Sequence, residues 1–389
     1  MLINQMKNIS LLFLLVVFVI SCNKNNSKKD KEAVLLTKYV NPFIGTGGHG
    51  HTYPGATVPF GMLQVSPVNG ISSWDWCSGY HYSDSLAIGF SHLSLSGTGI
   101  GDLVDVLFMP INKAVDLTIM PKSRDSLPYK SAYRHKNEKA SPGYYQVYLK
   151  DHHINAELTT SLRTAMHKYT YEEGDKQSVI IDLGFAINWD KATNTFIQVE
   201  DSFTVSGHRF STGWAKNQKV FFVAKFSKPM IEHRLVSDKN VVESIDDTSV
   251  KSAGQFFFNA DEGNELLVKV ALSSVSIDNA KENLDDGDFD FEAVKNQAEN
   301  TWNEALSKIR VETSVDSLKT IFYTALYHAQ LAPVTFSDKN GQFRKENDSI
   351  VTAENYTAYS TLSLWDTFRA EHPLLTLIAA DKVSDIVNT

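Results

Sequence analysis

The spacing of apolar residues changes part-way along the chain, and this change constrains the fold more than any other feature. From about residue 37 to about residue 276, apolar and polar positions alternate, as they do over 154–159. Alternation with a period of two is typical of a strand with one buried face. Other short, strand-like runs rich in Val, Ile, Phe and Tyr lie at 144–149, 179–183, 220–226, 255–258 and 266–272. We therefore predict an antiparallel sandwich or barrel rather than a Rossmann or TIM fold, in which strands alternate with helices.

Beyond this segment the apolar residues step by three and four, which is the period of an amphipathic helix. The first stripe comprises Phe291, Val294, Ala298, Trp302, Ala305 and Ile309. Asp288 or Asp290 stands where a helix N-cap is needed. A second stripe covers 315–329, a shorter one covers 364–368, and Pro373 suits the first turn of a fourth helix. The second part of the chain is therefore predicted to be helical.

Length and charge narrow the class of protein further. The 389 residues correspond to roughly two or three domains of ordinary size. We place a β domain at 37–285, a linker helix at 286–312 and the start of a helical domain at 313–389. Lys and Arg number 37 against 45 Asp and Glu, a net charge of −8. This balance argues against a nucleic-acid-binding protein, which needs a basic face.

The N-terminus has the pattern of a targeting signal. Residues 9–20 form an almost unbroken apolar run, too short for a permanent membrane span, and Lys7 precedes it. The run ends in Ser21-Cys22, which resembles a bacterial lipobox whose cysteine becomes acylated. We predict a lipoprotein signal peptide over 1–21, lipidation at Cys22 and a polar tether over 22–36. The protein would then be membrane-anchored in a bacterial cell envelope, in the periplasm or at the outer-membrane surface. The alternative is an ordinary secretory peptide with an incidental cysteine.

A glycine-rich segment at 41–56 contains a literal G-x-G-x-x-G at Gly45, Gly47 and Gly50. A dinucleotide site needs a helix directly after this motif, and the prolines that follow within ten residues exclude one. The glycines therefore serve a sharp turn or a close approach to a ligand. His49 and His51 are two residues apart and point the same way in an extended chain. They are metal ligands, sugar contacts or structural hydrogen-bonding groups, and the local sequence leaves these three readings open.

Three other segments contain residues capable of chemistry. Trp74-Asp75-Trp76 has either the composition of a carbohydrate platform or that of core aromatics with a turn aspartate. His92 and Asp102 invite a Ser-His-Asp interpretation, but no G-x-S-x-G elbow accompanies them. Asp366 and Arg369 share a helix face, either as a local ion pair or as a polar clamp with Trp365 as a stacking wall. Cys77 is predicted to be buried and inert, or to line a pocket.

Several short segments together form a recognisable pattern. They are 39–47, 54–56, 59–62, 79–82, 89–92, 95–99 and 226–229 in the β-rich part, followed by Phe322-Tyr323-Thr324-Ala325-Leu326-Tyr327-His328 and Ser363-Leu364-Trp365-Asp366-Thr367-Phe368-Arg369. From about Tyr39 to the last residue, the chain resembles glycoside hydrolase family 92, the exo-α-mannosidases.

The resemblance implies an α+β multidomain fold, in which an antiparallel β-sandwich and a linker helix precede an (α/α)6 barrel, with the active site between them. It implies calcium-dependent, inverting hydrolysis of α-mannosides such as N-glycans. In an inverting reaction one carboxyl group protonates the leaving oxygen and another activates a water. Calcium prefers about six to eight oxygen ligands, and the resemblance does not identify them here.

The resemblance also assigns individual residues. Trp365, Asp366 and Arg369 match the motif that lines the mannose-binding subsite. Phe43, Gly45 and Trp76 match sandwich residues that reach the same pocket.

The catalytic carboxylates are expected outside this sequence. The family's general acid lies in an E-G-N-x-W-Q-Y-like motif and its base in a G-N-D-D-like motif, and neither occurs here. Both are therefore expected downstream of Thr389, the last residue. The chain is thus expected to be a truncated form, with only the opening helices of the barrel, no catalytic carboxylates and no activity of its own.

Two other functions compete with this one. A non-catalytic glycan-binding surface lipoprotein would use the sandwich alone, through Trp74, Trp76 and the glycine-rich loops. An enzyme of the same architecture but different specificity, such as a phosphorylase, would depend on phosphate.

Overall fold

The computed structural model describes residues 35–70, 73–119, 123–172, 176–285 and 287–389. Residues 36–389 pack as a single unit. The predicted signal peptide, Cys22 and nearly all of the tether lie outside the described residues. None of the helices in the described ranges has both the length and the apolar character that a membrane crossing requires.

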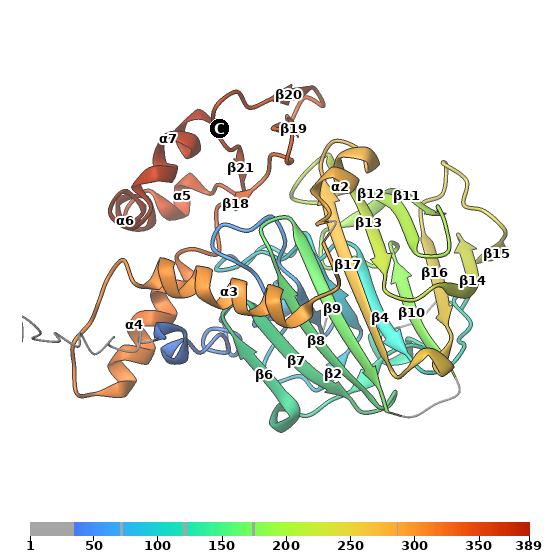
Figure 1. Ribbon diagram of the computed structural model, residues 1–389. Coiled ribbons are helices and arrows are strands. Elements are labelled where there is room, and N and C mark those ends of the chain that lie inside the picture. Colours follow the sequence, from blue (N-terminus) through green and yellow to red (C-terminus); the bar gives the residue numbers. More distant parts are fainter. Residues whose placement is uncertain (1–34, 71–72, 120–122, 173–175, 286) are drawn as a thin grey trace, which may run out of the picture. The chain divides into compact units, whose positions relative to one another are not determined.

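Two antiparallel sheets form the β-rich part of the chain (Figure 1). The eight-stranded sheet has the order β11-β12-β13-β17-β9-β8-β7-β6, and the seven-stranded sheet has the order β1-β3-β4-β10-β16-β14-β15. The strands of the first are β6 (Glu138–Ser141), β7 (Tyr144–Leu149), β8 (Ile154–Thr160), β9 (Thr164–Tyr171), β11 (Lys191–Val199), β12 (Thr204–Thr212), β13 (Gln218–Phe226) and β17 (Glu265–Ser273). The strands of the second are β1 (Ser66–Val68), β3 (Gly89–Ser91), β4 (Leu107–Ile111), β10 (Gln177–Asp182), β14 (Met230–Ser237), β15 (Asn240–Val242) and β16 (Ser252–Phe258).

The two sheets pack face to face around one apolar core. The rings of Phe90 on β3 and Tyr169 on β9 are 6.4 Å apart, and those of Phe226 on β13 and Phe256 on β16 are 6.3 Å apart. Each pair joins the two sheets. The arrangement is therefore a sandwich, one of the two architectures that the period-two pattern predicts.

Helices follow the sandwich, as the change of period predicts. They are α2 (Ile277–Asn283), α3 (Phe291–Leu306), α4 (Asp316–His328), α5 (Leu364–Thr367), α6 (Glu371–Ile378) and α7 (Ala380–Asn388). The Asp290 carboxylate caps α3 by accepting a hydrogen bond from the Ala293 amide at 2.9 Å. Helix α3 lies across β7, β8 and β9, and α2 packs on β13 and β17. The stripe predicted over 364–368 forms only the single turn of α5.

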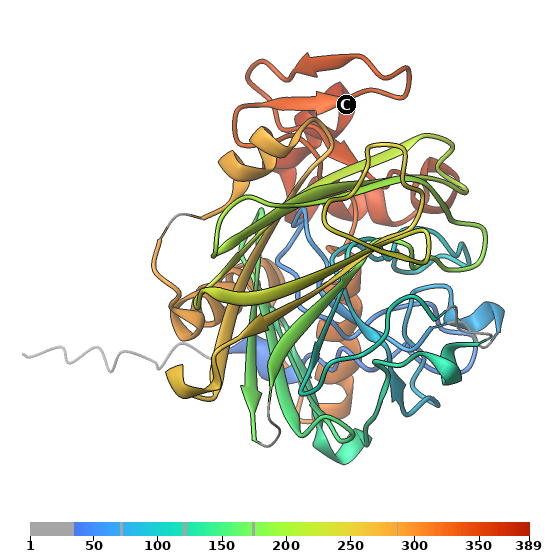
Figure 2. The ribbon, with the colours of Figure 1, turned by 90° about the vertical axis from the view of Figure 1, so that its right-hand side faces the viewer.

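Short strand pairs complete the described structure, and the sequence pattern did not predict them. They are β2 (Leu86–Ala87) with β5 (Ser131–Ala132), β18 (Val334–Thr335) with β21 (Tyr359–Ser360), and β19 (Gln342–Arg344) with β20 (Ile350–Thr352). The 3-10 turns are η1 (Leu36–Tyr39), η2 (Trp74–Trp76), η3 (Arg124–Ser126), η4 (His135–Asn137) and η5 (Ala260–Glu262). The segment after α4, coloured red in Figure 2, lies at one end of the sheets.

A second apolar cluster joins the sandwich to the helices. Trp302 of α3 is fully buried, and its ring lies 4.5 Å from that of Tyr327 of α4 at an angle of 46°. Its Nε1 donates to the Thr57 carbonyl at 2.6 Å. Nearby, the Asp338 carboxylate accepts hydrogen bonds from the Ser273 hydroxyl at 2.6 Å and from the Asn283 side-chain amide at 2.6 Å. These contacts fix α4 and the following segment against the loops of the sandwich.

Candidate substrate-binding site

Residues 41–56, which we call the glycine-rich loop, form a tight turn. Gly45 has a φ of +88°, and its carbonyl accepts from the Thr52 amide at 3.2 Å. A Cβ on Gly50 would lie 2.1 Å from the same carbonyl oxygen, so only glycine fits there. The segment that follows contains no helix. The structure therefore agrees with the reading of these glycines as a turn rather than a dinucleotide motif.

Residues 73–84, the tryptophan loop, pack directly against the glycine-rich loop. The Tyr82 amide donates to the Thr46 carbonyl at 2.8 Å, and the Ser78 hydroxyl donates to the His51 carbonyl at 2.7 Å. The rings of Phe43 and Tyr82 meet edge to face at 5.8 Å. These contacts bring the loops that carry Phe43, Gly45 and Trp76 to one corner of the sandwich.

His49 and His51 both turn towards Asp75. Oδ1 of Asp75 is 3.0 Å from His49 Nδ1 and 3.3 Å from His51 Nε2. The hydrogen bond from His49 is the main cause that lowers the pKa of Asp75. The carboxylate is therefore engaged in holding the two loops together. This geometry supports the structural hydrogen-bonding role among the three that the sequence left open.

Trp74 and Trp76 differ in exposure. Trp74 is 54% exposed and its indole donates to the Gly99 carbonyl at 2.8 Å, whereas Trp76 is half-buried. Trp76 stacks on the His81 ring at 4.1 Å and 20°. Neither ring belongs to the sandwich core, so the structure favours the platform interpretation over that of core aromatics.

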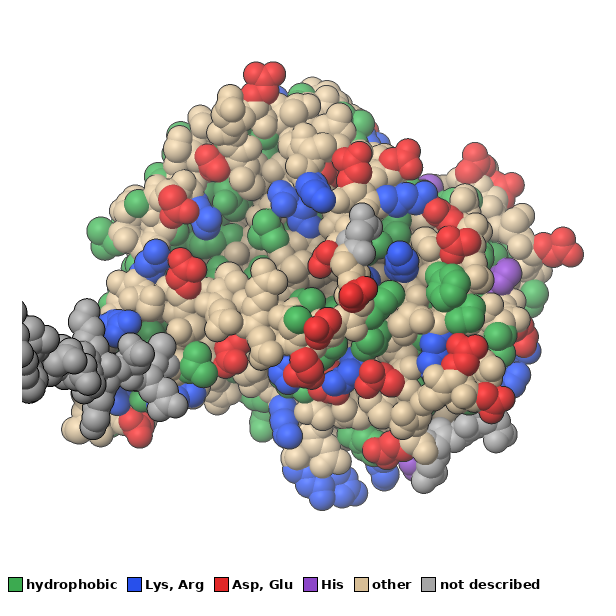
Figure 3. Space-filling view, in the orientation of Figure 1, with side chains coloured by type: hydrophobic (Ala, Val, Ile, Leu, Met, Phe, Trp, Pro, Cys, Tyr) green, Lys and Arg blue, Asp and Glu red, His purple; other side chains and the backbone are tan. Residues whose placement is uncertain are grey.

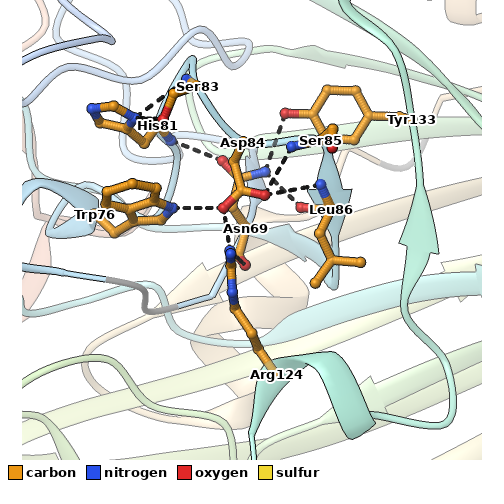
Figure 4. A network of polar contacts seen from close by, with 9 residues as sticks. All are labelled: Asn69, Trp76, His81, Ser83, Asp84, Ser85, Leu86, Arg124 and Tyr133. Atoms are coloured by element: carbon orange, nitrogen blue, oxygen red, sulfur yellow. Dashed lines mark hydrogen bonds and ion pairs between the residues drawn. The ribbon is translucent and has the colours of Figure 1, made fainter.

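A polar network fixes the Trp76 ring from behind (Figure 4). The Asp84 carboxylate accepts from Trp76 Nε1 at 2.8 Å and forms an ion pair with Arg124. Arg124 also donates to the Asn69 carbonyl at 2.7 Å, and the Asn69 side chain accepts from the His81 amide at 2.8 Å. Because these groups are buried or half-buried and mutually bonded, they hold the indole and its stacking partner in one orientation.

Helix α4 reaches the glycine-rich loop through His328. A Cβ on Gly45 would stand 3.7 Å from His328 Cε1. Burial lowers the pKa of His328 to about 4, so its imidazole is neutral near pH 7. Its Nε2 atom is buried without a hydrogen-bond partner, as are the hydroxyls of Tyr53 and Tyr327. Sequence reasoning did not single out His328, although it lies within a segment that carries the family resemblance.

The segment 363–369 is exposed and separate from these loops. Trp365 is 85% exposed, Asp366 accepts a hydrogen bond from the Ser363 hydroxyl, and Arg369 lies 5.4 Å from the Phe368 ring. No hydrogen bond, ion pair or ring contact within the described ranges joins these residues to either loop. Asp366 and Arg369 do not pair with each other, because α5 ends at Thr367 and Arg369 lies beyond the helix.

Thr389, beyond which the acid and base are predicted to lie, has a structural role. It follows α7, and its hydroxyl accepts from the Tyr359 amide at 3.1 Å and donates to the Asp385 carbonyl at 2.9 Å. These bonds tie the end of α7 to β21. The position of the two catalytic motifs downstream of Thr389 stays a prediction, since the described residues end there.

Two other sequence-based candidates have structural roles. His92 is fully buried, 3.0 Å from His167, while Asp102 accepts from the backbone amides of Leu103 and Ala215. The Ser-His-Asp interpretation is therefore wrong. Cys77 is buried, and burial raises the pKa of its thiol to about 11, which agrees with an inert cysteine.

Metal-ligating side chains do not gather within the described residues. There, no group of three or more His, Cys, Asp or Glu side chains converges closely enough to hold an ion. Calcium prefers about six to eight oxygen ligands. No cluster of such side chains therefore marks a calcium site among the described residues.

Sequence reasoning missed the residues that hold Trp76 in place. Asp84 and Arg124 are 40 positions apart, and neither stands in a motif. Glu371 was also missed, and burial raises its pKa to about 7. No local sequence pattern predicts the contacts of Asp84 and Arg124 or the raised pKa of Glu371, because both depend on the environment that the folded chain creates.

Comparison with known proteins gives the family. Residues 39–273 match the model of the glycosyl hydrolase family 92 N-terminal domain, and residues 278–389 match that of the family 92 catalytic domain. A curated relative, an uncharacterised secreted glycosidase of Arthroderma benhamiae, is 25% identical over 344 residues, which cover 78% of this chain and 42% of the relative.

Solved structures give the same result. A family 92 α-mannosidase of Bacteroides thetaiotaomicron is 37% identical with a TM-score of 0.84, over 91% of this chain and 49% of its own. The same enzyme in complex with mannoimidazole matches at 37% identity with a TM-score of 0.81, over 88% and 46% of the two chains. An inverting family 92 mannosidase of that organism is 26% identical with a TM-score of 0.77, over 92% and 48%. This chain spans less than half the length of each relative and belongs to glycoside hydrolase family 92.

Proposed function

We propose that the protein to which this chain belongs is an exo-acting α-mannosidase that releases mannose from α-mannosides such as N-glycans, with inversion at the anomeric carbon. The observation that carries the proposal is the convergence of the Phe43, Gly45 and Trp76 loops at one corner of a family 92 chain. Two of its solved relatives are described as mannosidases, and one of them binds mannoimidazole.

The residues of this corner bind and orient the sugar in the proposed reaction. The Trp76 indole offers a flat apolar surface for the C–H face of a pyranose, and Asp84 keeps that surface in place. The turn at Gly45 lets the backbone approach the ligand without an intervening side chain. Trp365, Asp366 and Arg369 lie in a separate, exposed segment. We assign them, on the family resemblance, a stacking wall and polar groups for the hydroxyls of the same sugar. Binding energy used in this way positions the anomeric carbon for attack by water.

The acid and base are not assigned to residues of this chain, because the two motifs expected to carry them are absent from the sequence up to Thr389. We therefore propose that the 389-residue polypeptide alone binds α-mannosides without turning them over. A calcium requirement is also proposed on the family resemblance. No cluster of acidic side chains among the described residues marks its site, and no step is assigned to the ion.

The test is the release of mannose from an aryl α-mannoside and from a high-mannose glycan. A longer polypeptide that contains this sequence together with both missing motifs should be active, and chelation should abolish the activity until calcium is restored. Proton NMR should show β-mannose as the first product. Activity that is insensitive to chelator would remove calcium from the proposal, and turnover by the 389-residue chain would show that its own residues include the acid and base.

We also propose that Cys22 is lipidated and that the protein is anchored in the bacterial cell envelope. The support is the lipobox-like sequence at 19–22. Substitution Cys22→Ser should release the protein from the membrane fraction and remove incorporated radiolabelled fatty acid. Labelling that persists in the variant would overturn this proposal.

A further inference from the structure

Two exposed tryptophans stand together at one end of the eight-stranded sheet. Trp189 is 53% exposed and Trp214 is 65% exposed, and their rings lie 6.2 Å apart at an angle of 33°. Lys191 on β11 pairs with Thr212 on β12. Because these strands are antiparallel, each tryptophan lies two residues beyond this last pair, at the same end of the sheet. The register of the sheet therefore brings the two rings together.

Buried charged side chains hold the backbone beside Trp189. Arg209, which is fully buried, forms ion pairs with Asp105 and with Asp190, the residue after Trp189. It also donates to the Leu183 carbonyl at 3.1 Å. Because these ion pairs and hydrogen bonds join buried groups, they favour one conformation of the backbone at Asp190.

The turn that carries Trp214 is anchored by a different carboxylate. Asp102 accepts from the amide of Ala215, the residue after Trp214, at 2.7 Å. A Cβ on Gly213 would lie 3.0 Å from an oxygen of Asp102. The carboxylate therefore lies close to the residues directly before and directly after Trp214. Both indoles thus project from turns that are already ordered without a ligand. A preorganised site loses less conformational entropy on binding.

The surroundings of the two rings indicate the kind of ligand. Segments 184–190 and 211–217 expose no other large apolar side chain, and the exposed residues beside the rings include Asn188, Lys216 and Asn217. A protein interface would bury a larger apolar centre. Acidic and basic side chains are also intermixed over the face of the molecule seen in Figure 3. Two flat rings framed by amide and ammonium groups instead match a carbohydrate, which presents apolar C–H faces edged with hydroxyls.

One loop connects this pair to the candidate substrate-binding site. The Gly97 amide donates to the His51 carbonyl at 2.8 Å, and the Gly99 carbonyl accepts from the Trp74 indole. A few residues later, a Cβ on Gly101 would overlap the Asn188 side chain, and Asp102 holds the turn of Trp214. Residues 97–102 therefore run from the tryptophan loop to the exposed pair.

We propose that Trp189 and Trp214 form an outlying carbohydrate subsite, which stacks against pyranose units of a mannose-containing glycan away from its terminal residue. This inference rests on the proposed function for the identity of the sugar. The subsite would raise affinity for long or polymeric mannosides and leave single mannose units unaffected.

The experiment compares binding of yeast mannan and of methyl α-mannoside to the 389-residue chain. The double variant Trp189→Ala/Trp214→Ala should bind mannan roughly tenfold or more weakly and methyl α-mannoside equally well. Variant Trp189→Phe/Trp214→Phe keeps both rings and should retain most of the mannan affinity. Phe203→Ala is the matched control, because Phe203 is 40% exposed in the turn at the other end of β11 and β12. Unchanged mannan binding by the double alanine variant would overturn the proposal.

A second measurement needs no variant. Mannan should protect Trp189 and Trp214 of the unmodified chain from oxidation by N-bromosuccinimide, as mapped by peptide mass spectrometry. Absence of protection at both positions would also overturn the proposal. Failure of the proposed function is distinguishable from either result. If methyl α-mannoside does not bind and Trp365→Ala changes nothing, the mannosidase site is wrong, while a mannan affinity that depends on Trp189 and Trp214 still supports the subsite.

Discussion

The Nε2 atoms of His92 and His167 lie 3.0 Å apart in the core of the sandwich, where both side chains are fully buried. His92 Nδ1 is 2.7 Å from the Val106 carbonyl oxygen, and His167 Nδ1 is 2.7 Å from the Tyr169 hydroxyl. One assignment of protons satisfies all four groups: His92 donates to Val106, His167 donates to His92, and Tyr169 donates to His167. Both imidazoles are then neutral. Burial lowers the pKa of His92 to about 4 and that of His167 well below its usual range.

This pair predicts a loss of stability in mild acid. In the unfolded chain both imidazoles regain a pKa near 6.5, so the unfolded state binds protons that the folded state excludes. The stabilisation is complete above about pH 6.5 and declines as the pH falls towards the folded pKa values. We expect the free energy of unfolding to drop by roughly 1–2 kcal/mol per histidine between about pH 6.5 and about pH 5.

Urea denaturation at both pH values measures this drop. The variant His92→Gln/His167→Gln should be less stable than the unchanged protein near neutrality and should lose less stability on acidification. An equal loss in the two proteins would assign the pH dependence to other groups.

Trp302 predicts how strongly the helices are attached to the sandwich. It is fully buried, and its Nε1 donates to the Thr57 carbonyl across the second apolar cluster. Trp302→Ala should lower the free energy of unfolding by about 3–5 kcal/mol, because it removes a large buried ring and leaves a cavity. Trp302→Phe should cost less, about 1–3 kcal/mol, mainly by leaving the Thr57 carbonyl unpaired.

Thr301→Ala on the exposed side of the same helix is the control, and it should change stability by less than about 0.5 kcal/mol. Chemical denaturation monitored by circular dichroism checks all three variants. If Trp302→Ala were as mild as the control, the second apolar cluster would not hold the helices in place.

Much of the fold could be predicted because its signals are local. The β7 strand alternates half-buried and buried residues, and the α3 stripe repeats along one face, so each element is specified by its own residues. The segment 334–360 is different. Its short strands depend on distant partners, such as Arg163 donating to the Ser337 carbonyl and Asn283 donating to Asp338. Local periodicity contains no information about such pairings.

The candidate site also combines residues that local sequence patterns predict with residues that depend on distant partners. Glycine density and family resemblance predicted Gly45 and Trp76, since turn chemistry and motifs are visible in the sequence. The Asp84–Arg124 pair depends on two segments that only the folded chain brings together. The predicted shared face of Asp366 and Arg369 assumed a longer helix, whereas α5 ends after one turn.

The glycine-rich loop offers a sharp test of backbone geometry. A Cβ at Gly50 would lie 2.1 Å from the Gly45 carbonyl oxygen, a backbone atom that cannot move without reshaping the turn. Gly48 has a φ of +62° with no atom within 4 Å of an added Cβ. Gly50→Ala should therefore cost about 2–4 kcal/mol, and Gly48→Ala only about 1 kcal/mol for the left-handed conformation. Thermal unfolding of the two variants side by side measures the difference, and equal losses would contradict the described turn.

Asp84 predicts the importance of the network behind Trp76. Asp84→Asn removes the charge that pairs with Arg124 and weakens the acceptor for Trp76 Nε1. With its orientation less fixed, the indole should bind methyl α-mannoside about three- to tenfold more weakly, and stability should fall by roughly 1–3 kcal/mol. Asp116→Asn is a suitable control, because it makes the same chemical change at an exposed carboxylate that bonds to Thr118. Trp76→Phe lacks the indole donor, so adding Asp84→Asn to it should weaken binding less than Asp84→Asn does alone. Isothermal titration of these proteins tests this. If Asp84→Asn bound the mannoside as tightly as the unchanged protein, Asp84 would serve stability alone and would not position Trp76.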